Sequence, residues 1–333
     1  MKRRPVVIDA NSVIVRAIMA TALEDLRAGV DGPFTGGVYG ATRTLVSVLN
    51  SPGVAASRIV AFFDAGVPPR RLELLPDYKS KRKESRQLLT PEQKERAFQQ
   101  INACADLWPT LGVTCLSYKD READDGVAAA SRIFLERGDT PLIVTTDRDL
   151  WQCIAWGAEV WSLRDAVIVD RGNFEETTGV DPGLWLLYRA LSGDPSDSIR
   201  GVPGCGPKRS AELVASVGRI GVDETYLPPR GSDAIGALLA LLSRRPYDGT
   251  KLRKFEESVL QSEPMLRRTY EAINLWDSFG RLDALRARIE ASASVDRKAF
   301  LRGAAKLGFA SFLGDPDGVL GPFVAAACAP IAP

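Results

Sequence analysis

Two carboxylates stand directly before a glycine-rich turn late in the chain. Asp194 and Asp197 precede the segment 204–209, which reads Gly-Cys-Gly-Pro-Lys-Arg. Glycine lets the backbone approach a ligand closely, so amides that open the next helix can point at a phosphate while the basic residues supply charge. A glycine turn taken alone also fits simple capping of a helix. The adjacent carboxylates favour the first interpretation, a hard cation held next to a bound phosphate.

The segments before this turn predict an α/β fold. Short apolar runs rich in β-branched residues alternate with helical patterns, and one helix opens with a threonine N-cap followed by proline. Strands that alternate with helices indicate a parallel sheet covered by helices on both faces. The expected strands lie at 6–8, 59–63, 113–116 and 142–144, and the expected helices at about 37–50, 90–107 and 122–137.

Acidic residues follow three of the predicted strands. Asp9, Asp64 and the pair Asp147 and Asp149 each come where an apolar run ends. Ligands of open parallel sheets bind at the carboxyl ends of the strands, so we expect these side chains to meet at one edge. Residues three apart in a helix share a face, so acids in the first turn of the helix at 122–137 can join them. These acids are Glu122, Asp124 and Asp125.

Together these nine carboxylates form a negative cluster that needs compensation. Either several stay protonated with a raised pKa, or divalent cations neutralise them, and the many acids on separate elements favour cations. The chain contains no histidine, and oxygen ligands select Mg²⁺ or Mn²⁺ over zinc. Two such ions can activate a water and stabilise the leaving oxygen of a phosphodiester. Each aspartate alone fits a helix cap or a turn, but the combined pattern predicts two metal sites.

Composition excludes several other classes of protein. The 333 residues, 45% of them apolar, suffice for one large or two ordinary domains. The absence of histidine excludes Ser-His-Asp and Cys-His catalysis. The five cysteines lack a Cys-x-x-Cys pair, which favours reduced thiols. No apolar run approaches the roughly 20 residues of a membrane span, so we expect a cytoplasmic protein without a signal peptide.

Positive charge is concentrated in one segment. The net charge is only +1, so binding to nucleic acid must use local patches. Between Arg70 and Arg86 there are seven basic residues against three acidic ones. Such a run fits either a solvated surface or a phosphate-binding segment.

The motifs also carry a specific resemblance. They are Asp9 with Arg16 seven residues on, Asp64 followed by Leu-Pro-Asp-Tyr-Lys-Ser-Lys-Arg at 75–82, Glu-Ala-Asp-Asp at 122–125, Thr-Thr-Asp-Arg-Asp at 145–149, and the stretch 193–208. Over about residues 5–215 the chain resembles the 5′ nuclease (flap endonuclease) superfamily, especially stand-alone bacteriophage 5′-3′ exonucleases and the 5′ nuclease domain of bacterial DNA polymerase I. Arg189 stands where phage relatives carry lysine, and Arg70-Arg71 where relatives commonly show Phe-Arg.

The resemblance implies a division of the chain. A PIN-like catalytic core occupies 1–172, with a helical arch at about 66–100. A helical C-terminal region at 173–325 contains a helix-three-turn-helix DNA-binding element at about 198–217. Residues 326–333 form a tail, and the chain reads as loosely held from Gly321-Pro322 onward. No polymerase follows residue 217, so we expect a stand-alone nuclease.

The resemblance further assigns roles to single residues. One metal belongs to Asp9, Asp64, Glu122 and Asp124, with Asp125 close by, and the other to Asp147, Asp149, Asp194 and Asp197. Lys79 and Arg82 contact the scissile phosphodiester, and Tyr78 stacks on a base near it. The expected catalytic residues are Lys79, Arg82, Asp9, Asp64 and Asp149. The residues expected to bind DNA are Arg16, Tyr78, Lys81, Lys83, Arg189, Gly204, Gly206, Lys208 and Arg209, and K⁺ assists the glycine turn.

The activity implied is that of a structure-specific 5′ nuclease dependent on two Mg²⁺ or Mn²⁺ ions. The expected substrates are branched or nicked duplex DNA with a 5′ single-stranded flap and RNA·DNA hybrid, cut by a monomer in a bacterial cytoplasm during replication and repair. One alternative is an RNA-cleaving PIN-type nuclease, against which the duplex-gripping glycine turn argues. The other is a non-catalytic DNA-binding scaffold, against which the complete set of acids argues.

Overall fold

The structure of this chain is a computed structural model. It describes residues 3–20, 25–88, 90–218, 233–291 and 293–327. Within these ranges no helix is both long enough and apolar enough to span a membrane.

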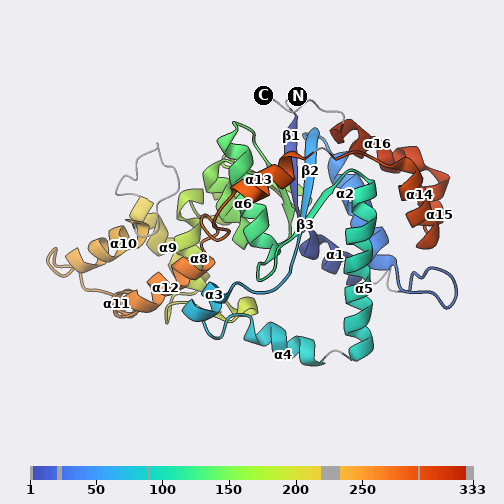
Figure 1. The fold of residues 1–333 in the computed structure, drawn as a ribbon. Coiled ribbons are helices and arrows are strands. Elements are labelled where there is room, and N and C mark those ends of the chain that lie inside the picture. The colour runs from blue at the N-terminus through green and yellow to red at the C-terminus, as the bar shows by residue number, and fades with distance from the viewer. Residues whose placement is uncertain (1–2, 21–24, 89, 219–232, 292, 328–333) are drawn as a thin grey trace.

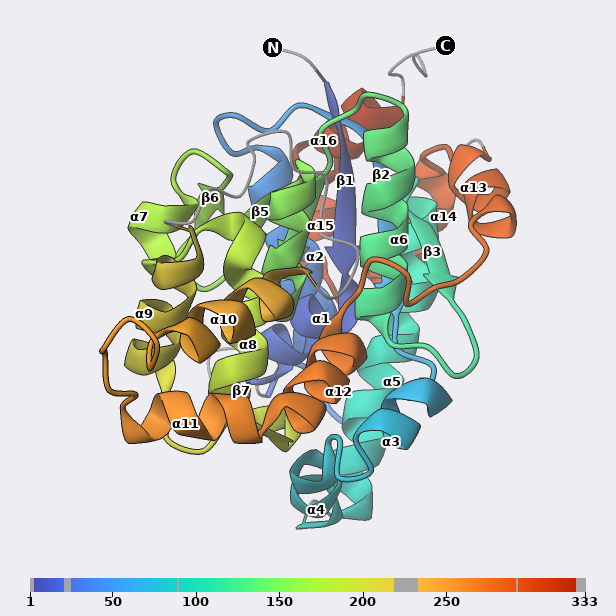
Figure 2. The ribbon, with the colours of Figure 1, turned by 90° about the vertical axis from the view of Figure 1, so that its left-hand side faces the viewer.

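A six-stranded sheet forms the centre of the molecule (Figures 1 and 2). The strand order is β3-β2-β1-β4-β5-β6, and all neighbours are parallel except β5 and β6. The predicted parallel sheet is therefore confirmed, with one antiparallel strand at its edge. The strands are β1 (Arg4–Asp9), β2 (Ala56–Phe63), β3 (Thr114–Ser117), β4 (Leu142–Thr145), β5 (Glu159–Ser162) and β6 (Val167–Val169).

The strands are apolar on both faces because helices cover both faces. In β1, Val7 belongs to one buried cluster while Val6 and Ile8 belong to the other. In β4, Ile143 and Val144 divide in the same way. Successive side chains of a strand point to opposite faces, so a continuous apolar run serves two cores at once.

The first face carries helices from both ends of the chain (Figure 1). Trp108, which is fully buried, and Phe312 from the C-terminal helices belong to the same core on this side. The helices here are α1 (Ala10–Ile18), α2 (Gly36–Leu49), α5 (Pro91–Leu107), η2 (Trp108–Thr110), α14 (Arg297–Lys306), α15 (Ala310–Gly314) and α16 (Pro316–Ala327).

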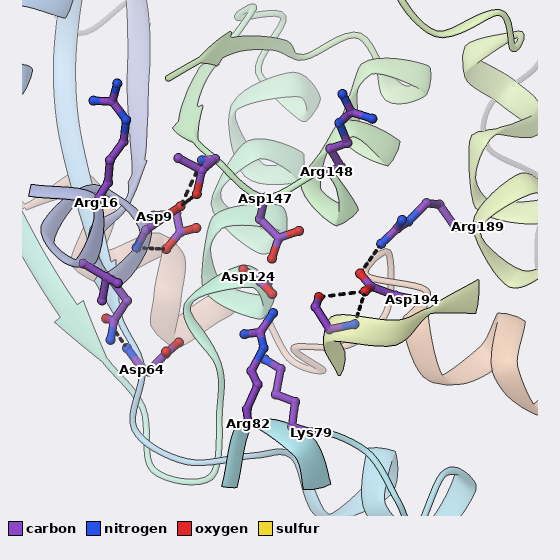
Figure 3. Close-up of a pocket in the computed structure, with 15 residues that line it drawn as sticks. Asp9, Arg16, Asp64, Lys79, Arg82, Asp124, Asp147, Arg148, Arg189 and Asp194 are labelled. Atoms are coloured by element: carbon purple, nitrogen blue, oxygen red, sulfur yellow. Dashed lines mark hydrogen bonds and ion pairs between the residues drawn. The ribbon is translucent and has the colours of Figure 1, made fainter. Parts of the chain in front are cut away.

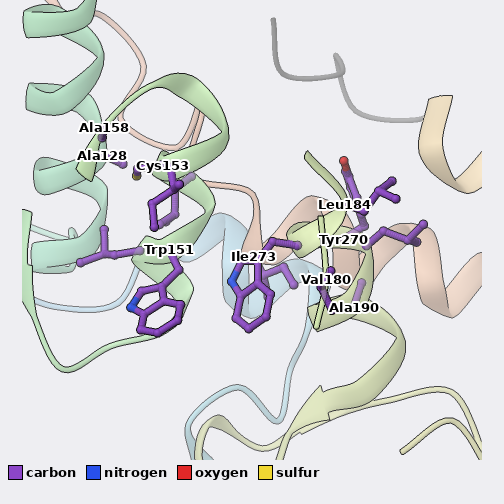
Figure 4. Close-up of a cluster of buried hydrophobic side chains, with 14 of the residues drawn as sticks. Ala128, Trp151, Cys153, Ala158, Val180, Leu184, Ala190, Tyr270 and Ile273 are labelled. Carbon is purple, nitrogen blue, oxygen red and sulfur yellow. The ribbon is translucent and has the colours of Figure 1, made fainter. Parts of the chain in front are cut away.

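The second face carries the middle of the chain and most of its C-terminal half (Figure 2). Aromatic packing joins these helices, since Trp151 stacks on Trp185 at 6.0 Å between ring centroids. Figure 4 shows Trp151 in this buried cluster together with Leu184 and Ile273. This packing holds in place the helix that begins at Asp149 and the helix that contains Arg189. The helices are α6 (Ala123–Glu136), η3 (Asp149–Trp156), α7 (Phe174–Thr178), η4 (Pro182–Leu184), α8 (Trp185–Ser192), α9 (Pro207–Gly218), α10 (Asp233–Arg244), α11 (Lys254–Gln261), α12 (Glu263–Ile273) and α13 (Asp283–Glu290).

Three helices occupy the segment expected to form an arch. They are α3 (Pro69–Leu74), α4 (Ser80–Leu88) and the long α5. α4 lies at the far end of the molecule from α16 in both views (Figures 1 and 2). α5 starts as predicted, because Thr90 caps it and forms a reciprocal capping box with Gln93.

The glycine turn follows a short hairpin that separates α8 from α9. Between α8 and α9 lie a short hairpin, β7 (Gly193–Asp194) with β8 (Ile199–Arg200), and the turn η5 (Pro195–Asp197) that joins its strands. The range 198–217 therefore contains only the second of the two helices that flank the turn.

The expectation of a loose end from residue 321 is wrong. α16 continues to Ala327 with Pro322 inside it, and Leu320 and Phe323 are buried against the sheet. The apolar face of the helix outweighs the local cost of proline. Residues 328–333 of the expected tail lie outside the described part of the chain.

Candidate active site

Three aspartates lie where parallel strands end at one edge of the sheet (Figure 3). Asp9 closes β1, and its carboxylate accepts a hydrogen bond from the Thr145 hydroxyl at the end of β4 (2.9 Å). Asp64 follows β2, and its carboxylate accepts one from the amide of Ala123 that opens α6 (2.7 Å). Asp147 comes two residues after β4. The structure therefore brings these acids together as expected.

The acids at the start of α6 point in two directions. Asp124 lines the cavity at the sheet edge. Glu122 and Asp125 form a capping box, in which the Glu122 amide donates to the Asp125 carboxylate (3.2 Å). Asp125 is fully buried and pairs with Arg71 (2.7 Å), while Glu122 pairs with both Arg71 and Lys79. Asp125, expected close by the first metal, thus faces Arg71 rather than the cavity, and Glu122 is engaged with cations rather than exposed to the cavity.

Arg71 lies at the centre of these ion pairs, a role that the sequence did not reveal. It is 6% exposed, and its Nε donates to the carbonyl of Ala272 in α12 (3.1 Å). Burial opposes its charge, but the neighbouring carboxylates raise the pKa of the guanidinium above its usual value. Its partners lie 51, 54 and 201 residues away along the chain, so no local sequence pattern indicates these contacts.

A second group of acids lies beside the first. Asp149, Asp194 and Asp197 each offer a carboxylate oxygen, and these oxygens lie within 4.8 Å of one another. Arg189 of α8 lies between two of them and pairs with Asp149 (2.7 Å) and Asp194 (2.6 Å). Arg189 was expected on DNA, and the structure places it within the acidic site instead (Figure 3).

The hairpin geometry that presents Asp194 depends on Gly193. Gly193 has φ +71°, and a Cβ at this position would lie 2.3 Å from the amide nitrogen of Gly201. Neither the conformation nor the space suits a side chain. Gly193 therefore fixes the hairpin that carries Asp194 and Asp197.

The start of α4 delivers two cations to the cavity (Figure 3). Lys79 pairs with Glu122, and its amide donates to the Asp197 carbonyl (2.7 Å). Arg82 pairs with the Asp197 carboxylate. Tyr78 is only 6% exposed, and its hydroxyl donates to Glu122 (3.0 Å). The expected stacking of Tyr78 on a base needs an exposed ring, which Tyr78 does not present in this structure, so the stacking stays a prediction.

The acids of the cavity raise one another's pKa values. Burial and the charge of Asp64 raise the pKa of Asp9 to about 6. Burial and the charge of Asp149 raise the pKa of Asp147 to about 7. The pKa of Asp124 rises because the group is buried and faces Asp147 and Asp9. Such mutual repulsion is relieved when a cation binds among the carboxylates.

Cations of the chain itself neutralise part of the cluster. Burial raises the pKa of Asp197 to about 6, although Lys79 and Arg82 oppose the shift. Arg71, Lys79, Arg82 and Arg189 all pair with predicted metal ligands. The sequence suggested protonation or divalent cations as the means of compensation, and the structure adds this third one.

These groups surround an open cavity of about 590 Å³. Asn11, Ser12, Val15, Thr146, Arg148 and Ser196 also line it, and none was expected there. Asn11 and Ser12 follow Asp9 directly, and Thr146 and Arg148 flank Asp147, so adjacency to the acids was the available signal. Asn11 orients the segment after β2, because its side-chain carbonyl accepts the Asp64 amide (3.0 Å).

The other residues expected to bind DNA lie on α1, on α4 and at the glycine turn. Arg16 is exposed on α1 and lines the cavity, and Lys81 is exposed on α4. The Lys83 side chain lies outside the described side chains.

The glycine turn lies before α9, apart from the residues that line the cavity. Lys208 and Arg209 are exposed there. Gly204 has φ +82°, whereas Gly206 is outside the left-handed region.

The fold and this site fit the following relatives. Residues 4–179 match the family model described as 5′-3′ exonuclease, N-terminal resolvase-like domain. The chain therefore belongs to the 5′-3′ exonuclease family. It is 33% identical over 217 residues to DNA polymerase I of Mycobacterium bovis, covering 64% of this chain and 23% of that protein. It is 32% identical over 218 residues to the thermostable DNA polymerase I of Thermus filiformis, covering 66% and 24%.

The chain thus spans about a quarter of the length of these polymerases. Among solved structures, the zinc-bound T5 5′-exonuclease is similar with a TM-score of 0.64 and 19% identity over 97% of both chains. The catalytic core of Rad2 in complex with DNA is similar with a TM-score of 0.50 and 18% identity, covering 97% of this chain and 93% of that one. These likenesses confirm the fold class.

Proposed function

We propose that this protein is a structure-specific, divalent-metal-dependent 5′ nuclease that hydrolyses phosphodiesters in 5′-flap or primer-bearing DNA during replication and repair. The observation that carries the proposal is the cavity itself. Carboxylates from β1, from the segments after β2 and β4, from α6 and from the β7–β8 hairpin surround it, and Lys79 and Arg82 enter it from α4. Acids that hold metals opposite cations that hold phosphate are the parts that phosphodiester hydrolysis needs.

The residues present fit two hard divalent cations. All donors are oxygens, and the raised pKa values of Asp9 and Asp147 indicate carboxylates that lack enough positive charge around them. When bound, Mg²⁺ or Mn²⁺ ions supply the activation of water and the neutralisation of the leaving oxygen. We assign one ion to Asp9, Asp64 and Asp124 and the other to Asp147, Asp149, Asp194 and Asp197. Glu122 would influence the first metal site through its contact with Lys79.

The protein's own groups position the phosphodiester. Lys79 and Arg82 exchange their carboxylate partners for the scissile phosphate, where they oppose the negative charge that develops during hydrolysis. Arg71 keeps Glu122 and Asp125 in place beneath them. The Ser12 and Thr146 hydroxyls at the cavity wall add donors for phosphate oxygens.

Duplex DNA would bind along the start of α9. Lys208 and Arg209 in its first turn, together with the helix N-terminus, suit the phosphate backbone, and K⁺ at the glycine turn would add positive charge there. A T5 flap endonuclease with this fold has been solved with DNA and metal ions. By this analogy we propose that the protein binds flapped DNA. We further propose that it acts as a monomer, that nicked and RNA·DNA duplexes are also substrates, and that it works in the cytoplasm.

The test is cleavage of a labelled 5′-flap duplex with Mg²⁺ or with EDTA, run beside single-stranded RNA and an Asp149→Asn variant. We expect metal-dependent cutting at the flap junction that the variant loses by at least about a hundredfold while still binding the flap. Cutting confined to RNA would replace the proposal with a PIN-type ribonuclease. Tight binding without cutting would replace it with a DNA-binding scaffold.

A further inference from the structure

The N-terminus of α11 packs directly against the glycine turn that precedes α9. The Cys205 thiol lies 3.8 Å from the carbonyl of Phe255 and donates to it. Gly204 lies above the same residue, since a Cβ there would be 3.4 Å from the Phe255 Cβ. Phe255 is 7% exposed. The last third of the chain, which no motif explained, therefore supports the backbone of this turn.

The Phe255 ring also carries two guanidinium groups. The Arg209 guanidinium carbon lies 5.0 Å from the ring centroid, and that of Arg253 lies 4.4 Å from it. Arg209 further donates from Nη1 to the Gly204 carbonyl (2.9 Å). Arg209 is exposed to solvent, yet its ring contact and its hydrogen bond both restrict its orientation.

The buried carboxylate of Glu256 holds Arg253 in place. Glu256 is fully buried and accepts hydrogen bonds from the Arg253 amide (2.8 Å) and guanidinium (2.5 Å), and it also pairs with Arg245. Arg253 reaches on to Glu212 in α9 (2.5 Å). The start of α11 is thus tied to α9 through the contact of the Phe255 ring with Arg209 and through the Arg253–Glu212 pair.

We infer that Phe255, held in place by the Arg253–Glu256 pair, is a positioning residue that orients Arg209 for contact with the phosphate backbone of duplex DNA. This inference rests on the proposed function, in which the turn before α9 grips the duplex. A long arginine side chain loses much rotamer freedom when it binds a phosphate. A side chain already held on a ring loses less, so the support strengthens binding without itself touching DNA.

The experiment is a double-mutant cycle read by equilibrium binding. Anisotropy of a labelled 5′-flap duplex in EDTA is measured across a salt series for the parent, Phe255→Leu, Arg209→Ala and the double variant. We expect Phe255→Leu to weaken binding about three- to fivefold and to lower the salt slope by about 1, as loss of one phosphate contact does. Added to Arg209→Ala, the same change should weaken binding no further.

Conservative variants separate positioning from stability. Phe255→Tyr keeps the ring and should restore both affinity and slope, and in flap cleavage Phe255→Leu should raise KM while kcat at saturating substrate holds. Arg253→Gln removes one guanidinium from the Phe255 ring at a half-exposed position, while Arg245 and the backbone amide of residue 253 still bond Glu256, and should weaken binding about twofold. This variant keeps the inference testable if Phe255→Leu misfolds.

Two results would overturn the inference directly, and a third would remove its premise. One is a lowered melting temperature for Phe255→Leu with unchanged affinity and slope, and the other is full additivity in the double variant. Unchanged binding by Arg209→Ala would overturn it through its premise, the duplex grip of the turn. Failure of the parent protein to cut flaps would instead count against the proposed nuclease function and leave the binding cycle readable.

Discussion

Arg189 shows how a single residue can determine the state of a metal site. Its guanidinium bridges Asp149 and Asp194, two of the three acids whose carboxylate oxygens lie within 4.8 Å of one another. A divalent cation among the same oxygens must compete with that guanidinium. If the proposed metal site is correct, the arginine should therefore stabilise the metal-free protein and weaken its affinity for the cation.

Replacing Arg189 with methionine should separate these two effects. Arg189→Met keeps the aliphatic stem, but it leaves Asp149 and Asp194 without their counter-ion. We expect the free energy of unfolding of the metal-free protein to fall by roughly 1–3 kcal/mol. We also expect Mn²⁺ to bind about fivefold or more tightly, since the competing charge is gone. Denaturant unfolding in EDTA and calorimetric titration with Mn²⁺ measure the two quantities.

Arg148→Met is the matched control for this prediction. Arg148 lines the same cavity but lies over the Trp151 ring, 5.3 Å from its centroid. Removing it should change Mn²⁺ affinity much less. Equal effects of the two variants would show that general electrostatics, not the bridging position of Arg189, controls the site.

The pKa values of the buried acids predict a pH dependence. Asp9 has a pKa of about 6 and Asp147 one of about 7, above the ordinary 3.8, so the folded, metal-free protein holds protons that the unfolded chain has released. Their contribution to stability is therefore present near pH 4 and lost as the pH rises to about 7. Calorimetry in buffers of different ionisation enthalpy should show proton release on Mn²⁺ binding at about pH 5.5 and almost none at about pH 8.

Among the elements, the short β7–β8 hairpin is the most constrained part of the site. Gly193→Ala would place a Cβ 2.3 Å from the Gly201 nitrogen in a residue with φ +71°. We expect this change to lower the free energy of unfolding by roughly 2–4 kcal/mol. It should also reduce flap cleavage, because Asp194 moves with the hairpin. Thermal unfolding and cleavage rates check both outcomes.

Gly236→Ala offers a control of opposite sign. Gly236 lies inside α10, where a Cβ meets nothing within 4 Å. Alanine should therefore stabilise the protein by roughly 0.5–1 kcal/mol. A similar loss of stability in both variants would mean that the hairpin conformation is not the cause.

Sequence patterns predicted the elements better than the side-chain partners. The ends of β1, β2 and β4 placed Asp9, Asp64 and Asp147 at one edge because parallel strands share their direction. The pattern at 122–125 correctly predicted the start of a helix. It could not show that two of its acids form a capping box and pair with Arg71 instead of facing the cavity. Local spacing records which residues share a face, whereas ion pairs across 51 residues depend on the assembled fold.

At the scale of the molecule, charge is separated although the net charge is only +1. Five carboxylates line the cavity beside five of the chain's own cations, whereas the exposed cations in the first turn of α9 lie apart from it. Without metal ions, the carboxylates of the site repel a phosphate backbone to the extent that these cations leave them uncompensated. Metal binding at the cavity and duplex binding at α9 should therefore favour each other, since each lowers the electrostatic cost of the other.

This separation predicts how affinity depends on salt. Lys208→Ala removes one exposed cation from the start of α9, far along the chain from the acids of β1 and β4. We expect weaker duplex binding, and we expect the slope of log K against log salt to fall in magnitude by about 1, because one fewer counterion is released. Lys298→Ala on α14 is the control, since it removes an exposed lysine from the helices on the opposite face of the sheet. If both variants lower the slope equally, duplex DNA is attracted by charge over the whole molecule and does not bind specifically at the start of α9.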